Sequence, residues 1–144
     1  MKCSDAGLEF IMAHEGCKLE AYPDPATGGE PWTIGVGHTG GVKPGDTCTK
    51  ERALEWLRKD AETAERCVNA SVKGNITQNQ FDALCSLVFN IGCGNFGKST
   101  VLREVNEEND MSAAAAFGMW NKAAGKVMAG LTKRRQDEMR LFLA

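Results

Sequence analysis

Two carboxyl groups and one hydroxyl near the start of the chain have the types and the spacing that glycosidic bond cleavage requires. Glu15 ends an apolar-periodic stretch, Asp24 follows nine positions later in a turn-rich segment, and Thr33 opens a glycine-rich β run. In such chemistry one acid stays protonated to donate to the leaving oxygen, while the other stays ionised to stabilise the oxocarbenium charge and a water. Singly, each residue has a structural interpretation as a solvated Glu, a turn-forming Asp or a strand Thr. Their combined pattern favours the catalytic interpretation.

A short helix is expected to carry Glu15 at its C-terminal end. Ser4 or Asp5 can cap this helix, and the apolar residues between 8 and 12 fall on one of its faces. Gly16 then supplies a left-handed stop. We therefore expect Glu15 beside a cleft, partly covered by apolar neighbours.

Residues 17–40 predict a small antiparallel sheet, because turn-forming prolines and glycines alternate there with β-favouring residues. Gly35, Gly37 and Gly40 also match the spacing of the dinucleotide-binding fingerprint. That motif must open a helix, whereas a further turn follows here at 41–46. We interpret the match as chance.

Helical periodicity governs the remainder of the chain. About twenty residues from Thr49 predict one long helix, and Thr77 with Gln80 forms a capping box that opens another. An apolar stripe along this second helix ends at Gly92, which makes the helix central to the core. Shorter helices are expected at about 100–107, 111–120 and 132–143.

The run from Thr33 to Gly40 completes, with Glu15 and Asp24, a pattern that resembles the phage lysozymes, the endolysins of glycoside hydrolase family 24. The resemblance spans nearly the whole chain. Further motifs that carry it are Gln78–Leu84, Val88–Gly92, Ser99–Leu102, Gly130–Leu131, Arg134–Arg135 and Glu138. The chain departs from the family at 27–31, which lengthens the turn between Asp24 and Thr33.

This resemblance implies an α+β, lysozyme-like fold, with a small antiparallel β lobe and a larger helical lobe joined by a long helix. Residues 1–144 then form a single lysozyme domain. Its β lobe lies at about 16–48, and its helical lobe comprises about 70–144 together with the N-terminal helix. The implied activity is that of an N-acetylmuramidase. Such a peptidoglycan hydrolase cleaves the β-1,4 bond between N-acetylmuramic acid and N-acetylglucosamine when a phage lyses its host.

Residue by residue, the family's catalytic set carries over to Glu15, Asp24 and Thr33. Glu15 donates the proton, Asp24 stabilises positive charge and orients a water, and Thr33 helps to hold that water. We expect inversion at the anomeric carbon, because retention needs a closer pair of carboxyl groups. Two alternatives stay open. One is a lytic transglycosylase, which manages with one acid, and the other is a cationic wall- or membrane-active protein without catalysis.

Other residues are assigned to the substrate or to the framework of the site. The resemblance favours contact with the sugar chain for Thr39, Phe89, Asn90 and Thr100. It also pairs His38 with Asp60, as structural partners. Either Arg134 or Arg135 is expected to approach Glu15, and the sequence does not choose between them.

Charge limits the range of partners. The chain has 144 residues and a net charge of −2, which indicates no general nucleic-acid partner. Residues 121–144 carry a local balance of +4, which we interpret as a solvated helix face. The alternative is a cationic C-terminal helix that contacts the outer membrane. Bacterial peptidoglycan is the expected partner of a monomeric protein.

Six cysteines and two histidines show no metal-binding spacing, so neither a metal nor a cofactor is expected. Cys85 lies on an apolar helix face and is expected in the core. For the remaining cysteines, thiols are the default in a reducing cytosol, and the alternative is oxidation in the periplasm. Their connectivity cannot be deduced from sequence.

No stretch has the length and apolar character of a membrane span, and the N-terminal residues lack the apolar core of a signal peptide. We therefore expect the protein to remain in the host cytoplasm until it is released to the periplasm. The resemblance implies that a holin performs this release.

Overall fold

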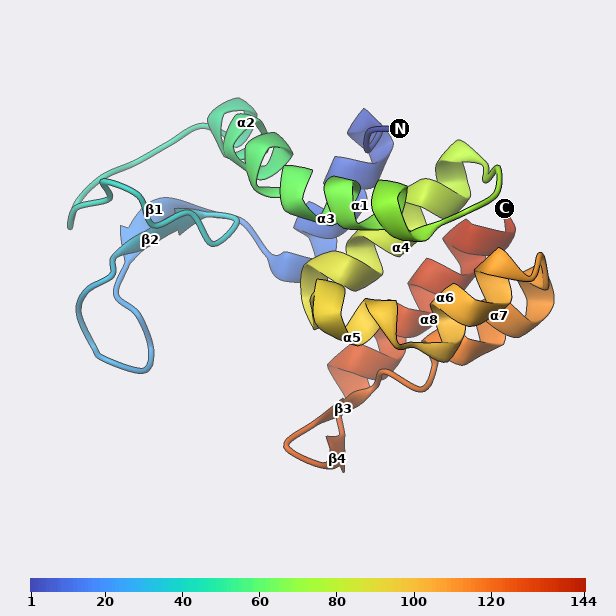
Figure 1. The fold of residues 1–144 in the computed structure, drawn as a ribbon. Coiled ribbons are helices and arrows are strands. Elements are labelled where there is room, and N and C mark those ends of the chain that lie inside the picture. The colour runs from blue at the N-terminus through green and yellow to red at the C-terminus, as the bar shows by residue number, and fades with distance from the viewer. The chain divides into compact units, whose positions relative to one another are not determined.

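The computed structural model describes residues 1–144, which divide into two compact units. The sheet unit comprises 8–60, and the helical unit comprises 1–7 together with 61–144. Helix α1 (Asp5–Glu15) contributes its first residues to the helical unit and the rest to the sheet unit. The α+β, lysozyme-like class predicted from the sequence is confirmed, with helices in the majority and two small antiparallel sheets (Figure 1).

The predicted antiparallel sheet lies in the sheet unit. Strand β1 (Lys18–Tyr22) pairs with β2 (Thr33–Gly35), and the register places Lys18 opposite Gly35 and Tyr22 opposite Thr33. Ile34, the middle residue of β2, exchanges two backbone hydrogen bonds of 2.9 Å with His38, which closes a tight turn.

The glycines of the fingerprint-like run belong to this tight turn. Gly35 has a φ of 64° and Gly37 a φ of 72°, values that favour glycine. No helix begins directly after them, since the next helix starts at Lys50. A Cβ on Gly35 would also lie 3.3 Å from the Cβ of Ala53 in the helix packed against β2. These observations exclude the dinucleotide-binding interpretation.

The long helix expected from Thr49 is divided at one residue. Helix α2 (Lys50–Asp60) ends in the sheet unit and α3 (Glu62–Ser71) begins in the helical unit. Ala61 between them keeps right-handed helical angles, with φ −71° and ψ −14°, and is fully buried. Neither proline nor glycine stands at this point, so the sequence carries no signal for the division.

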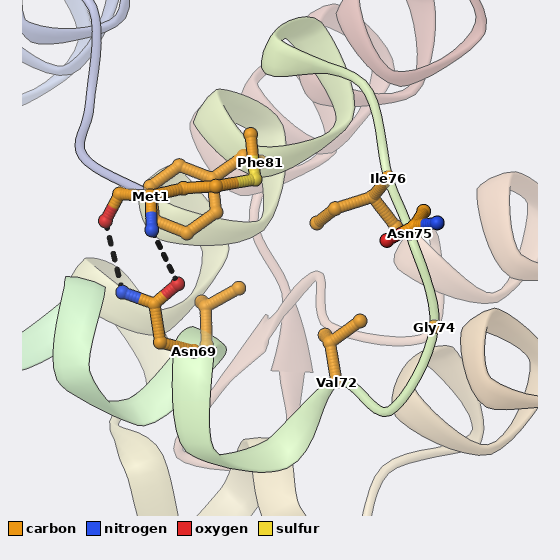
Figure 2. A pocket seen from close by; sticks show the side chains of 8 residues that line it. Met1, Asn69, Val72, Gly74, Asn75, Ile76 and Phe81 are labelled. Atoms are coloured by element: carbon orange, nitrogen blue, oxygen red, sulfur yellow. Dashed lines mark hydrogen bonds between the residues drawn. The ribbon is translucent and has the colours of Figure 1, made fainter.

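The core helix of the helical unit is α4 (Gln78–Ile91), which begins with the predicted capping box. The Thr77 hydroxyl accepts a hydrogen bond from the Gln80 N–H, and the Gln80 side chain accepts one from the Thr77 N–H. Ile76 and Phe81, which flank this box, line one hollow of about 500 Å³ (Figure 2). Helix α4 ends before Gly92, as predicted, and packs against α3 and α8 (Ala129–Leu143).

Most of the shorter elements agree with the sequence prediction. Helices α6 (Thr100–Asn106) and α7 (Asp110–Phe117) pack side by side, and α7 also packs on α8 (Figure 1). The α8 helix starts three residues before the predicted position at 132. Two elements were not predicted: the five-residue helix α5 (Cys93–Gly97) and the hairpin of β3 (Lys122–Ala123) with β4 (Lys126–Val127). Segments this short show no measurable hydrophobic period.

The disulfide between Cys67 and Cys93 corrects the default expectation of free thiols for these two cysteines. It joins α3 to α5 across 26 residues of sequence. Cys85 is a fully buried free thiol, as expected of a core residue. The N–H of Cys3, another buried cysteine outside the disulfide, donates to a carboxylate oxygen of Glu65 at 2.6 Å.

The N-terminal segment of the helical unit is fixed by Asp82, a buried acid on α4. The two oxygens of Asp82 accept hydrogen bonds from the N–H of Ser4 at 3.0 Å and from its hydroxyl at 2.5 Å. The Gln78 side chain donates to the same carboxylate at 2.9 Å. Gly7 packs so closely above this group that a Cβ there would lie 2.6 Å from the carboxyl carbon.

A second buried acid, Glu138 on α8, contacts two arginine side chains. Its carboxylate lies 2.6 Å from Nε of Arg135 and accepts hydrogen bonds from Arg135 at 3.0 Å, Arg134 at 3.3 Å and the Ser86 hydroxyl at 2.5 Å. All four residues are buried. Burial raises the pKa of the Glu138 carboxyl, against the lowering influence of Arg135, Ser86 and Arg134. We call this group the Glu138 cluster.

Candidate active site

Glu15 is the last residue of α1, where the chain leaves the helix. The N–H of Gly16 donates to the carbonyl of Met12 at 2.9 Å, and Gly16 has a φ of 85°, so the helix stops as the sequence predicted. Ile11 and Met12 are buried, but Glu15 itself is exposed. Glu15 is therefore more exposed than the expected partial cover by apolar neighbours implies.

Asp24 organises the turn that follows β1. Its carbonyl accepts hydrogen bonds from the N–H groups of Thr27 and Gly28, and its own N–H donates to the carbonyl of Gly29 at 2.9 Å. One carboxylate oxygen, Oδ1, accepts from the N–H of Ala26 at 2.7 Å. The other oxygen has no hydrogen-bond partner in the protein, and the residue is half-buried. A carboxylate held in this way is fixed in orientation while one oxygen stays available to a ligand.

Thr33 opens β2, as predicted, and lies opposite Tyr22 in the sheet register. Its side chain is buried, at 8% exposure, and the hydroxyl donates to the carbonyl of Pro31 at 3.2 Å. Since Tyr22 ends β1 and Asp24 follows two residues later, the structure brings Asp24 and Thr33 to the same end of the sheet.

Glu15 precedes the opposite end of β1. The pair Lys18 and Gly35 closes that end, three residues after Glu15. A five-residue strand spans about 13 Å at ~3.3 Å per step. The two acids therefore flank β1, and both belong to the sheet unit.

An open hollow of about 670 Å³ adjoins the Thr33 end of the sheet. Trp32 and Thr39 line it, together with Glu30, Pro31 and Val42. An aromatic face beside hydroxyl and carboxylate groups suits a sugar ring. Thr39 was predicted to contact substrate, whereas Trp32 was not singled out. The signal that could have found it is its position directly before Thr33, in a segment rich in turn residues.

The other predicted substrate residues lie in the helical unit. Phe89 and Asn90 occupy the last turn of α4, where Phe89 is half-buried and Asn90 exposed. Thr100 is the first residue of α6, directly after Ser99, whose hydroxyl caps that helix through the N–H of Leu102 at 3.1 Å. The structure thus places these side chains at helix ends of one unit, with at least part of each accessible.

His38 and Asp60 are not paired, which corrects the sequence prediction. The ring of His38 stacks on Trp56 of α2, with centroids 4.2 Å apart and planes 3° apart. The Arg52 guanidinium lies 5.4 Å from the centre of the Trp56 ring. Asp60 is exposed at the end of α2. Trp56 lies one helical turn before Asp60, so the aromatic ring takes up the position in which the carboxylate was expected.

Arg134 and Arg135 are both held in the Glu138 cluster of the helical unit. The approach of one of them to Glu15, which belongs to the sheet unit, stays a prediction. The Glu138 cluster is the main polar feature of the helical unit that the sequence did not predict, because charged residues at spacings of three and four along a helix are typical of a solvated face. The side chains of His, Cys, Asp and Glu form no group of three or more that could hold a metal ion.

Comparison with known proteins shows which family the chain resembles. Residues 12–138 match the phage lysozyme family. The endolysin of Salmonella phage P22 is 44% identical over 149 residues, covering 100% of this chain and 99% of that protein. The endolysin of Bacillus phage PZA is 43% identical over 143 residues, and there the chain spans 55% of the relative's length. A crystal structure of a P22 lysozyme mutant superposes with a TM-score of 0.92 at 41% identity, covering 100% of this chain and 99% of that one.

Proposed function

The chain belongs to the phage lysozyme family, and from that premise we propose that it cleaves the β-1,4 bond between N-acetylmuramic acid and N-acetylglucosamine in bacterial peptidoglycan. It is a glycoside hydrolase of the muramidase class. The observation that carries the proposal is the pair of acids that flank β1, with a threonine hydroxyl beside the second acid. Residues 1–144 act as a single lysozyme domain in this proposal.

Each catalytic residue has a distinct role. Glu15 donates a proton to the leaving oxygen, while Asp24 stabilises the developing positive charge and orients the attacking water. The hydrogen bond from the Ala26 N–H fixes the orientation of the Asp24 carboxylate and leaves Oδ2 for the water. Thr33, fixed through its bond to the Pro31 carbonyl, supplies the lone pairs of its hydroxyl to the same water.

The reaction inverts the anomeric carbon in this proposal. Retaining enzymes need carboxyl groups about 5 Å apart, whereas inverting enzymes leave room for a water between them. The length of β1 between Glu15 and Asp24 supports the wider arrangement. Proton NMR of the first-formed product on a soluble glycan tests this point, since the α anomer indicates inversion and the β anomer contradicts it.

Contact with the sugar chain is proposed for Thr39, Phe89, Asn90 and Thr100. Trp32 joins this set, because it shares its hollow with Thr39. Trp32→Ala should raise KM with little effect on kcat, as expected when uniform binding is lost. Trp120→Ala, a change of the same type in the helical unit, provides the matched control.

Peptidoglycan is the substrate that the family implies, and we propose that the chain acts on it as a monomer, without nucleic acid. None of its helices has the length and apolar character needed to cross a membrane. Release from the host cytoplasm to the periplasm by a holin remains the proposed route.

The charges of α8 give little support to an outer-membrane contact, because most of them are engaged within the protein. Arg134 and Arg135 are buried around Glu138, while Lys133 and Arg140 each pair with Asp137. Little unpaired charge is then left on α8 for an anionic lipid surface. A cationic membrane-active protein is therefore the weaker candidate.

Digestion of purified Gram-negative peptidoglycan, with the products identified by mass spectrometry, tests the reaction. A muramidase releases fragments with reducing N-acetylmuramic acid ends. Anhydro-muramic ends would instead establish transglycosylation. An absence of fragments, in protein shown to be folded by circular dichroism, would refute the proposed hydrolysis.

A further inference from the structure

Two buried cysteines of the helical unit lie outside the disulfide between Cys67 and Cys93. This unit holds four of the six cysteines of the chain, and the other two belong to the sheet unit. Cys3 is 3% exposed, and Cys85 is fully buried on α4. The proposed catalysis uses neither of them, so these two thiols are the only pair that the helical unit has left for further sulfur chemistry.

Hydrogen bonds to two buried acids hold Cys3 beside α3 and α4. Its N–H donates to a carboxylate oxygen of Glu65 on α3 at 2.6 Å. The next residue, Ser4, donates its N–H and its hydroxyl to the two oxygens of Asp82 on α4, at 3.0 Å and 2.5 Å. Asp82 and Cys85 are three residues apart, so they lie on the same face of α4. Cys3 is therefore held against the face of α4 that carries Cys85.

The thiols of Cys3 and Cys85 are in direct contact. They share a hydrogen bond, and this bond, together with burial and the negative charges of Glu65 and Asp82, raises the pKa of the Cys85 thiol. Sulfur atoms at hydrogen-bonding distance need only small side-chain rotations to reach the ~2.05 Å of a disulfide. Since a stable thiolate is what favours the reduced form of a reactive pair, the two acids remove that advantage and leave the oxidised form favoured.

We propose that Cys3 and Cys85 form a second disulfide of the helical unit when the protein meets a disulfide oxidant, and that this bond ties the segment before α1 to α4. The thiolate of Cys3 attacks one sulfur of the oxidant, which forms a mixed disulfide and releases the other half of the oxidant as a thiolate. The thiolate of Cys85 then attacks the sulfur of Cys3 and releases the second half. Two cysteine thiols are thus oxidised by two electrons, and one oxidant disulfide is reduced to two thiols, which take up the two cysteine protons.

The two cysteines of the sheet unit, Cys17 and Cys48, provide a contrast within the same chain. Both are half-buried, and Cys17 directly precedes β1. Glu20 bridges Thr47, and the Cys48 N–H donates to the carbonyl of Leu19 at 2.9 Å, so Cys17 and Cys48 are diagonal neighbours across this short pairing. Diagonal neighbours have Cα atoms about 7–8 Å apart, which is beyond the usual separation in a disulfide. We therefore expect these two thiols to stay reduced under conditions that oxidise Cys3 and Cys85.

Treatment of the full chain with oxidised glutathione, followed by trapping of the remaining thiols with iodoacetamide in denaturant, tests the pairing. Chymotrypsin cleaves after Phe10 and Phe89, so Cys3 and Cys85 each leave on a peptide without a second cysteine. Mass spectrometry without reduction should find these two peptides linked and the thiols of the sheet unit trapped. Trapped thiols on both Cys3 and Cys85 after the Cys67–Cys93 disulfide has formed, or a link from Cys3 to another cysteine, would overturn the proposal.

The melting temperature gives a second readout, which needs no substrate and so does not depend on the proposed function. A disulfide that closes a long loop of the unfolded chain should raise the melting temperature by about 10 °C. Cys3→Ser should lose this rise, whereas the matched control, Cys17→Ser with Cys48→Ser, should keep it. The oxidised forms of the two variants should therefore differ by about 10 °C, and a reductant should abolish the difference. A difference of the same size in oxidised and reduced protein would overturn the proposal, since it would arise from packing around Cys3 alone.

Discussion

Replacement of Arg135 by Met should destabilise the protein more than any change to its exposed charges, because it leaves a buried acid with too few partners. Arg135 is 1% exposed and Glu138 is fully buried. The substitution removes the 2.6 Å contact and the 3.0 Å hydrogen bond to Glu138, and also the bond to the Trp120 carbonyl at 3.3 Å. Breaking a buried pair from one side costs about 3–5 kcal/mol of unfolding free energy.

The loss should also depend on pH. Burial already raises the pKa of Glu138 above its ordinary value of 4.5, and Arg135 is the strongest influence that lowers it. Without Arg135 the folded protein keeps this proton over a wider pH range, while the unfolded chain releases it near 4.5. The unfolding free energy of the variant then falls as pH rises through the folded pKa, by up to about 1.4 kcal/mol per pH unit. The difference in unfolding free energy between wild type and the variant should therefore be small near pH 4 and largest at neutral pH.

Urea unfolding followed by circular dichroism between pH 4 and 8 measures this deficit. Arg140→Met is the matched control, because Arg140 lies on the same helix and pairs with Asp137 at 3.1 Å with its side chain 72% exposed. That change should cost less than about 1 kcal/mol at every pH. A deficit in Arg135→Met that is equally small, or that shrinks as pH rises, would refute the assignment of Arg135 as the main partner of Glu138.

Three further predictions concern stability. Thr77→Ala removes half of the capping box and should cost about 1 kcal/mol in urea unfolding, whereas an unchanged midpoint would show that α4 does not depend on its cap. Gly7→Ala should destabilise by about 1–3 kcal/mol, although alanine is the better helix former, because its Cβ would meet the hydrogen-bonded Asp82 carboxylate at 2.6 Å; a gain in melting temperature would contradict this packing. Cys93→Ser opens a 26-residue loop to Cys67 and should cost about 3.5 kcal/mol under oxidising conditions, and a reductant should remove the difference from wild type.

The sequence predicted the elements whose local chemistry is strong. The capping box at Thr77 and the glycine stop at Gly16 depend on groups adjacent in the chain, and the structure confirms both. The small antiparallel sheet within 17–40 was predicted from the alternation of turn-forming and β-favouring residues, and the structure adds its pairing of 18–22 with 33–35. The proposed catalytic pattern also rests on residues near in sequence, since Asp24 and Thr33 are carried to one end of a short sheet; their roles stay a proposal.

The features that could not be predicted depend on contacts between distant residues. Arg134 and Arg135 look like surface charges on α8 until Ser86 is brought to them from α4, 48 residues away along the chain. The stacking of His38 on Trp56 depends on how α2 packs against β2. The same holds for the disulfide, because the choice among six cysteines is made by the approach of α5 to α3.

The central claim is that Glu15 is the general acid, and one comparison tests it most directly. Initial rates of peptidoglycan hydrolysis should be measured for wild type, Glu15→Gln and Glu20→Gln, the last being an exposed acid on β1 that lies between the two proposed catalytic carboxyls in sequence. Loss of a general acid predicts a fall in kcat of about 10²–10⁴-fold for Glu15→Gln, with an unchanged melting temperature. Glu20→Gln should retain the wild-type rate. A Glu15→Gln protein with wild-type activity, or an equal loss in both variants, would contradict the account.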